Sequence, residues 1–400
     1  MGPMVIVGAG ECGTRAAFAL RENGWAGEIV LLGDEAGLPY ERPPLSKPGP
    51  GGVERRDICD ADALLNQRVD HRAAVSVTGL DRERKTLLLG NGQSLRYGKL
   101  LLATGACPRP LSCPGHEHAI ALRTQADAQA LFPRVRPGGH AVLVGAGLIG
   151  MELASTLRQA GMKVTVLEAG ERALGRGVPV PLADRLLARH RAEGVEFRFQ
   201  AGIDRIEPDA VLLKDGSRLP ADLVLAAIGV LPNTWLAGQA GLEVDNGIVV
   251  DERLTTSDPD ILAAGDCARF PDAMSGGLVR LESWQNARDQ GEHAARVMLG
   301  EAAAFSAMPW FWSDQYELGL QVAGWPVASQ PWLMRETDGQ SELCFQLDGN
   351  QRLLAVGGLG PGNSVARDIK LAQMLMVKGA RCDEAVLRDP AIPLKSLLRG

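Results

Sequence analysis

Two glycine-rich turns of identical spacing occur in this chain of 400 residues. Each turn follows a short apolar run, at 4–7 and at 141–144, and precedes an apolar helical pattern. The turns read GAGECG, with Gly8, Gly10 and Gly13, and GAGLIG, with Gly145, Gly147 and Gly150. In such turns the first glycine permits a tight bend, the second lets the backbone approach a pyrophosphate, and the third lets the helix pack closely. The sequence therefore predicts two dinucleotide-binding units, with helices over 11–22 and 151–160.

An acidic residue ends the next strand in both units. Asp34 follows EIVLLG, and Glu168 ends KVTVLE, which is the position from which an acid takes adenine-ribose hydroxyls. Glu168 would repel the 2′-phosphate of NADPH by about 4 kcal/mol at about 4 Å and intermediate dielectric. We therefore expect NADH over NADPH, a preference that the nearby Arg172 and Arg176 could soften.

Three further apolar strands end in glycine turns. Residues 100–106 and 224–233 each close one unit, and 260–268 ends at Gly265-Asp266. Asp266 is suited to accept from a ribityl hydroxyl while an adjacent helix N-terminus faces a phosphate. The alternative is that Asp266 is only the N-cap of that helix.

Composition excludes several classes of protein. The net charge is −6 with no Lys/Arg block, which argues against a nucleic-acid partner. No apolar run approaches the length of a membrane span, and the chain starts in a strand without a secretory signal, so we expect a cytoplasmic protein. The seven cysteines are scattered without CxxC spacing, which predicts reduced thiols and neither disulfides nor a metal site.

The last ninety or so residues alternate in hydrophobicity. The runs LQVAGW, PWLMRE, ELCFQLDGN and RLLAVGGL predict antiparallel strands with a hairpin turn at Asp348-Gly349. A helix over 365–378 should follow, and the apolar tail RDPAIPLKSLL should pack against the domain.

Motifs along nearly the whole chain resemble the FAD-dependent NADH:ferredoxin reductases that serve Rieske oxygenases and cytochromes P450. They are GAGECG, LPYERPPLSK, LLATGACPRPL, LRT, GAGLIGMELA, TSDPDILAAGDCA, ESWQNA and PWFWSDQY. The resemblance implies an α/β fold of two Rossmann-like domains and a C-terminal α+β interface domain. The FAD domain would comprise 1–112 and 237–307, interrupted by the NAD domain at 113–236, with the interface domain at 308–400.

The resemblance also implies site residues. FAD would occupy the first crevice and NADH the second. Lys47, Glu152 and Trp312 would act in catalysis: Lys47 beside the flavin ring, Glu152 facing the nicotinamide, and Trp312 on the approach to the flavin. The residues implied in cofactor binding are Gly8, Gly10, Cys12, Gly13, Asp34, Lys47, Val77, Thr104, Gly105, Arg123, Gly145, Gly147, Ile149, Gly150, Glu152, Glu168, Gly229, Gly265, Asp266 and Trp284.

The absence of cysteine from one segment indicates how electrons leave the flavin. The stretch 39–47 holds no cysteine, so a dithiol relay is not expected and the flavin passes electrons outward itself, one at a time. The implied acceptor is a small acidic iron–sulfur ferredoxin, with rubredoxin less favoured. Candidates for a basic patch that steers it are Arg42, Arg288, Arg367 and Lys370; scattered solvated charge is the alternative.

Other readings remain open at this point. Without the resemblance, Lys47 would be interpreted as an exposed lysine in a loop and Glu152 as a glutamate on a helix surface. Trp312 would be interpreted as a side chain of the hydrophobic core. The segment 48–75 is shorter and less regular than its counterpart in the resembled family, and 358–368 differs near the acceptor-facing edge. An NADH oxidase or peroxidase would need a flavin-side cysteine, and 35–58 has none. The third reading is a redox-sensing binding protein similar to apoptosis-inducing factor.

Overall fold

The computed structural model describes residues 2–48, 52–272, 274–306, 308–336 and 339–399. The chain forms two compact units, which are described separately below. The first contains 1–43, 55–107 and 230–309, and the second contains 44–54, 108–229 and 310–400. Residues 49–51, within the segment that departs from the resembled family, lie outside the described residues.

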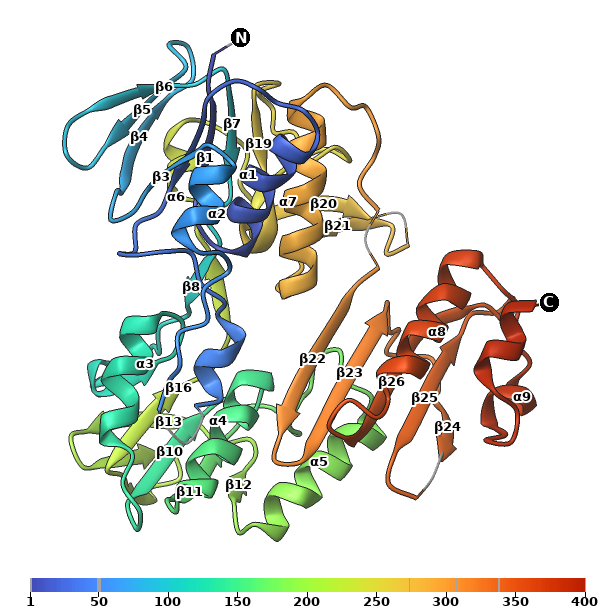
Figure 1. Ribbon diagram of the computed structural model, residues 1–400. Helices are drawn as coiled ribbons and strands as arrows, with labels where there is room; N and C mark the ends of the chain where they lie inside the picture. Colours follow the sequence, from blue (N-terminus) through green and yellow to red (C-terminus); the bar gives the residue numbers. More distant parts are fainter. Residues whose placement is uncertain (1, 49–51, 273, 307, 337–338, 400) are drawn as a thin grey trace. The chain divides into compact units, whose positions relative to one another are not determined.

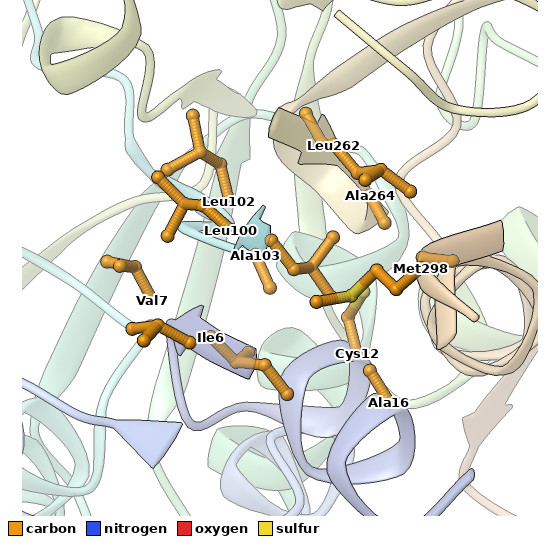
Figure 2. Packing of buried hydrophobic residues seen from close by; sticks show 14 of the residues in the cluster. Ile6, Val7, Cys12, Ala16, Leu100, Leu102, Ala103, Leu262, Ala264 and Met298 are labelled. Atoms are coloured by element: carbon orange, nitrogen blue, oxygen red, sulfur yellow. The ribbon is translucent and has the colours of Figure 1, made fainter. Parts of the chain in front are cut away.

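The first unit is built on a parallel sheet of five strands in the order β19-β7-β1-β2-β3. Their bounds are Met4–Val7 for β1, Ile29–Leu32 for β2, Val69–Arg72 for β3, Lys99–Leu102 for β7 and Ile261–Ala263 for β19. The central strands are apolar throughout and buried on both faces, as is typical of parallel strands. Helices α1 (Glu11–Glu22) and α7 (Trp284–Met298) pack against each other (Figure 1). Figure 2 shows Ile6, Cys12, Leu102 and Met298 among the side chains of this core.

The second unit repeats the same design. Its parallel sheet has the order β12-β11-β10-β16-β9. The strands span Ala119–Ala121 (β9), His140–Val144 (β10), Lys163–Leu167 (β11), Glu196–Arg198 (β12) and Leu223–Ala226 (β16), with helices Leu148–Gln159 (α4) and Val180–Ala192 (α5). The glycine-turn strand, β1 or β10, is central in both sheets, so both predicted nucleotide-binding units are confirmed as Rossmann-like.

A three-stranded antiparallel sheet is inserted at the corresponding place in each unit. In the first it comprises β4 (Val77–Asp81), β5 (Thr86–Leu89) and β6 (Ser94–Arg96), between β3 and β7. In the second it comprises β13 (Ile203–Glu207), β14 (Ala210–Leu213) and β15 (Arg218–Pro220), between β12 and β16. The internal repeat therefore extends beyond the glycine turns to the whole βαβ-meander-β arrangement.

The C-terminal part of the second unit is an antiparallel sheet in the order β22-β23-β26-β25-β24 (Figure 1). The strands span Trp310–Gln315 (β22), Leu318–Gly324 (β23), Leu333–Glu336 (β24), Glu342–Leu347 (β25) and Leu353–Pro361 (β26). Helix α8 (Ala366–Lys378) packs on β23 and β26. The predicted strands, the hairpin after Asp348 and the helix are confirmed, and the tail packs through buried Leu394.

Two local predictions need correction. No α-helix begins at Asp266: residues Gly265–Cys267 form a single 3-10 turn with Ala264 as its N-cap, and β20 (Ala268–Asp272) comes next. Both versions of the Asp266 argument assumed a helix there, and in that respect both are wrong. The chain extends because β20 pairs with two strands and buries Phe270. Helix α4 begins at Leu148, three residues earlier than expected, because Gly147 is its N-cap.

Across the described ranges, no helix has both the length and the hydropathy required to cross a bilayer.

Candidate active site

The first glycine turn is crowded at two positions and open at one. A Cβ atom on Gly8 would lie 2.0 Å from the Ala103 carbonyl oxygen, and one on Gly13 would lie 1.9 Å from the Gly8 carbonyl oxygen. Gly8 also has a φ of +114°, which side chains disfavour. A Cβ on Gly10 would meet nothing within 4 Å. Packing therefore requires glycine at the first and third positions, while the second faces space where a phosphate can approach.

The second turn reproduces this pattern. A Cβ on Gly145 would lie 2.4 Å from the Ala227 carbonyl oxygen, and one on Gly150 would lie 2.1 Å from the Gly145 carbonyl oxygen. A Cβ on Gly147 would meet nothing within 4 Å. Helices α1 and α4 begin at these turns, so their unpaired N–H groups are available to an anion. Both turns thus fit the pyrophosphate of a dinucleotide.

Glu168 is held by the backbone of the second turn. Its Oε2 accepts a hydrogen bond from the Ala146 N–H at 2.8 Å, and its Oε1 accepts from the Gly170 N–H at 2.7 Å. Each oxygen keeps a further lone pair for a ribose hydroxyl. Arg172, which could have softened the preference for NADH, donates to the Leu174 and Gly175 carbonyl oxygens of its own loop.

We expect Glu168→Arg to shift the kcat/KM ratio for NADPH over NADH by about a hundredfold or more, because it removes a repulsion of about 4 kcal/mol. The KM for NADH should also rise, since the Ala146 and Gly170 N–H groups lose their acceptor. Initial rates with both nucleotides measure this. An unchanged ratio would show that another residue reads the ribose.

The acids of the first unit are arranged differently. Asp34 is exposed just beyond the carboxyl end of β2. The neighbouring Glu35, which sequence reasoning missed, binds Arg42 at 2.7 Å and accepts from the Tyr40 hydroxyl at 2.5 Å. Asp266 is half-buried and its carbonyl oxygen accepts from Arg280 at 3.1 Å. Glu35 thus fixes the loop after the acid strand and leaves Asp34 accessible.

Glu152 is the centre of a buried polar cluster in the second unit. Its side chain is 8% exposed and forms an ion pair with Lys47, with 3.2 Å between Nζ and Oε1. The Ser46 hydroxyl donates to Oε2 at 2.5 Å, and the Ser313 hydroxyl donates to Oε1 at 2.8 Å. The Asp314 N–H also approaches Oε1 at 3.3 Å. Lys47 and Glu152 therefore form an ion pair in the folded chain, and Glu152 is no surface glutamate.

Lys47 lies between two carboxylates of unequal exposure. Besides Glu152 it contacts Asp314 Oδ2 at 3.2 Å, and the Asp314 side chain is 47% exposed. The short 3-10 helix Pro43–Ser46 precedes Lys47, and the Thr156 hydroxyl of α4 donates to the Ser46 carbonyl oxygen at 2.8 Å. This bond fixes the lysine loop to the helix that carries Glu152. The ammonium is thus held next to the first half of α4, just after the second glycine turn.

Sequence reasoning missed Ser46 and Ser313. The available signal for Ser313 was alternation: β22 reads WFWSDQ, so Phe311, Ser313 and Gln315 share one face. Two polar side chains on a face that begins with phenylalanine indicate a buried polar contact.

The remaining predicted residues are dispersed over the two units. Val77 begins β4, Trp284 begins α7, and the Thr104 hydroxyl donates to the Asn233 carbonyl oxygen at 2.6 Å in the first unit. In the second unit, the Arg123 N–H donates to Asp127, Ile149 is exposed on α4, and Trp312 stacks on Trp310 with ring centroids 5.2 Å apart. Gly105, Gly229 and Gly265 all have positive φ. Their roles stay predictions.

Two of the four predicted basic residues form ion pairs of their own. Arg42 pairs with Glu35, and Arg288 pairs with Glu292 and lies over the Trp284 ring. Both belong to the first unit, whereas Arg367 and Lys370 are exposed on α8 of the second. A common steering patch stays a prediction.

The thiols of Cys12 and Cys59 are poor redox groups. All seven cysteines are free. Burial raises the pKa of the Cys12 thiol beside the first glycine turn well above its usual value, and burial raises that of Cys59 to about 11. Because the thiolate is the reactive form, these side chains are unsuited to carry electrons at neutral pH.

Comparison with known proteins identifies the family. Residues 2–291 match the pyridine nucleotide-disulphide oxidoreductase family, and residues 310–398 match the reductase C-terminal domain. The chain belongs to the pyridine nucleotide-disulphide oxidoreductases. Putidaredoxin reductase of Pseudomonas putida is 38% identical over 99% of this chain and 96% of its own length. The ferredoxin–NAD(+) reductase component of the anthranilate 1,2-dioxygenase system of Burkholderia cepacia is 37% identical over 99% of both chains.

A solved structure shows the same fold. The covalent complex of putidaredoxin reductase with putidaredoxin matches with a TM-score of 0.92 and 36% identity, covering 100% of this chain and 98% of that one. Like other members of the family, this chain binds FAD and uses NAD(H). The two open glycine positions, Gly10 and Gly147, are consistent with both cofactors.

Proposed function

We propose that this enzyme passes electrons from NADH through FAD to a small acidic iron–sulfur ferredoxin, which supplies an oxygenase or a cytochrome P450. The observation that carries the proposal is the ion pair of Lys47 with the buried Glu152, which follows the second glycine turn, in a chain without a cysteine over 35–58. When bound, FAD supplies the change from two-electron to one-electron transfer. Relatives named as ferredoxin reductases over the full chain length support this acceptor.

The residues that face the cofactors have separate tasks in this proposal. Gly8, Gly10 and Gly13 hold the FAD pyrophosphate, and Asp34 and Asp266 hold its ribose and ribityl hydroxyls. Lys47 stabilises negative charge on the reduced flavin. Glu152 accepts from the nicotinamide amide and orients that ring, and Trp312 lines the approach to the flavin.

The remaining predicted residues complete the two cofactor sites in this proposal. Cys12, Val77, Thr104, Gly105, Arg123, Gly265 and Trp284 line the FAD site, and Gly145, Gly147, Ile149, Gly150, Glu168 and Gly229 line the NADH site. The domain division at 1–112 with 237–307, 113–236 and 308–400 belongs to this proposal. We place the reaction in the cytoplasm, which supplies NADH.

The dependence of cytochrome c reduction on an added ferredoxin tests the proposal. With purified FAD-loaded enzyme, NADH should bleach the flavin under anaerobic conditions, and cytochrome c should be reduced quickly only after a small ferredoxin is added. A screen of two-iron ferredoxins and rubredoxins against NADH oxidation identifies the acceptor class. Equal cytochrome c reduction without any iron–sulfur protein, or stoichiometric oxygen uptake, would contradict it.

A further inference from the structure

A row of buried polar side chains leads from Glu152 into the interior of the second unit. Beyond Ser313, the Gln315 Nε2 lies 3.1 Å from the Ser313 Oγ, and the His190 Nε2 lies 2.9 Å from the Gln315 Oε1. Ser313, Gln315 and His190 are all fully buried. The Tyr316 hydroxyl, 3.4 Å from the His190 Nδ1, ends the row. We call the four hydrogen-bonded residues Tyr316, His190, Gln315 and Ser313, in this order toward Glu152, the Glu152 chain.

The proton positions in the Glu152 chain follow from the Glu152 carboxylate, to which its last member donates. The Glu152 carboxylate, paired with Lys47, can only accept, so Ser313 uses its single proton toward Oε1. The Ser313 oxygen must then accept, which turns the NH₂ of Gln315 toward it. The Gln315 carbonyl consequently faces His190, whose Nε2 must carry the proton. Every donor in the chain therefore points toward Glu152.

His190 can accept a hydrogen bond from Tyr316 at Nδ1 only when its ring is uncharged. Burial lowers the pKa of His190 to about 4, and Arg189 next to it also lowers that pKa. A neutral ring with its proton on Nε2 leaves Nδ1 to accept from the Tyr316 hydroxyl. The ring is further held by edge contacts with Tyr316 at 4.9 Å and Phe197 at 6.0 Å between centroids.

We propose that His190 and Gln315 are positioning residues, which fix the Ser313 proton on Glu152 and thereby the orientation of its carboxylate. Without the His190 N–H, the Gln315 amide is free to turn and present its oxygen to Ser313. The Ser313 proton would then be drawn away from Glu152. This inference rests on the proposed function, in which Glu152 orients the nicotinamide, because a misplaced carboxylate slows hydride transfer.

Two substitutions of His190 by residues of similar size distinguish a positioning role of its N–H from a role in packing alone. His190→Leu removes the N–H, whereas His190→Gln can return an N–H near the position of Nε2. We expect the rate of flavin reduction by NADH, followed by stopped flow, to fall about tenfold in His190→Leu and to stay within about twofold of wild type in His190→Gln. The control Tyr316→Phe, which removes only the outermost donor, should change that rate less than about twofold. Electron transfer from chemically reduced flavin to ferredoxin should be unchanged in all three.

A spectroscopic measurement tests the chain apart from activity. In wild-type enzyme carrying isotope-labelled histidine, the ring nitrogens of His190 should show the neutral form protonated at Nε2 at neutral pH. The signal is assigned by its loss in His190→Gln. A ring protonated at Nδ1 alone would overturn the inference, as would wild-type flavin reduction in folded His190→Leu. Failure of NADH to reduce the wild-type flavin would instead count against the proposed function, and the histidine signal would still decide the proton order.

Discussion

Replacing Gly147 by leucine should raise the KM for NADH by about a hundredfold or more while FAD content and melting temperature change little. Gly147 has extended backbone, with φ −79° and ψ −175°, and a Cβ there meets nothing within 4 Å. The fold therefore tolerates the side chain. The leucine instead fills the space through which the pyrophosphate approaches the N-terminus of α4. Steady-state kinetics with varied NADH, the flavin absorbance spectrum and a thermal melt measure these three quantities.

Neighbouring glycines provide the matched controls for this prediction. Gly147→Ala adds only a methyl group and should give a smaller rise in KM. Gly150→Ala should impair folding instead, because its Cβ would lie 2.1 Å from the Gly145 carbonyl oxygen. Gly147→Leu enzyme with wild-type KM would show that NADH does not cross this turn.

Lys47→Ala should slow flavin reduction by NADH about a hundredfold, the loss typical of removing one charge-stabilising donor. FAD should remain bound, because the first glycine turn is untouched. The ammonium is 3.2 Å from the buried Glu152 carboxylate, so its removal also leaves a buried charge without its cation. Anaerobic stopped-flow absorbance at saturating NADH gives the rate of reduction.

The other carboxylate beside Lys47 supplies the control. Asp314 is also 3.2 Å from Nζ but its side chain is 47% exposed, so Asp314→Asn should change the reduction rate by less than about threefold. Lys47→Ala enzyme that is reduced as fast as wild type would remove this lysine from the proposed reaction.

Local patterns were sufficient to predict both nucleotide-binding units. Glycines at this spacing after a buried strand indicate a tight turn, because the steric requirement for a missing Cβ or a positive φ acts over short range. The predicted helix over 11–22 is confirmed by α1 for the same reason. The helix expected after Asp266 was wrong because β20 is stabilised by pairing with strands that the local sequence does not reveal.

The surroundings of Glu152 depended on long-range packing. The sequence places Lys47 and Glu152 more than a hundred residues apart, and no local pattern indicates that they form an ion pair. Ser313 on β22 and His190 on α5 come from separate elements again. The sequence by itself determined where the two cofactor turns are, because backbone sterics act within a few residues. Only the tertiary structure decided which polar groups surround Glu152, since a buried carboxylate is satisfied by whatever donors the folded chain brings within hydrogen-bond distance.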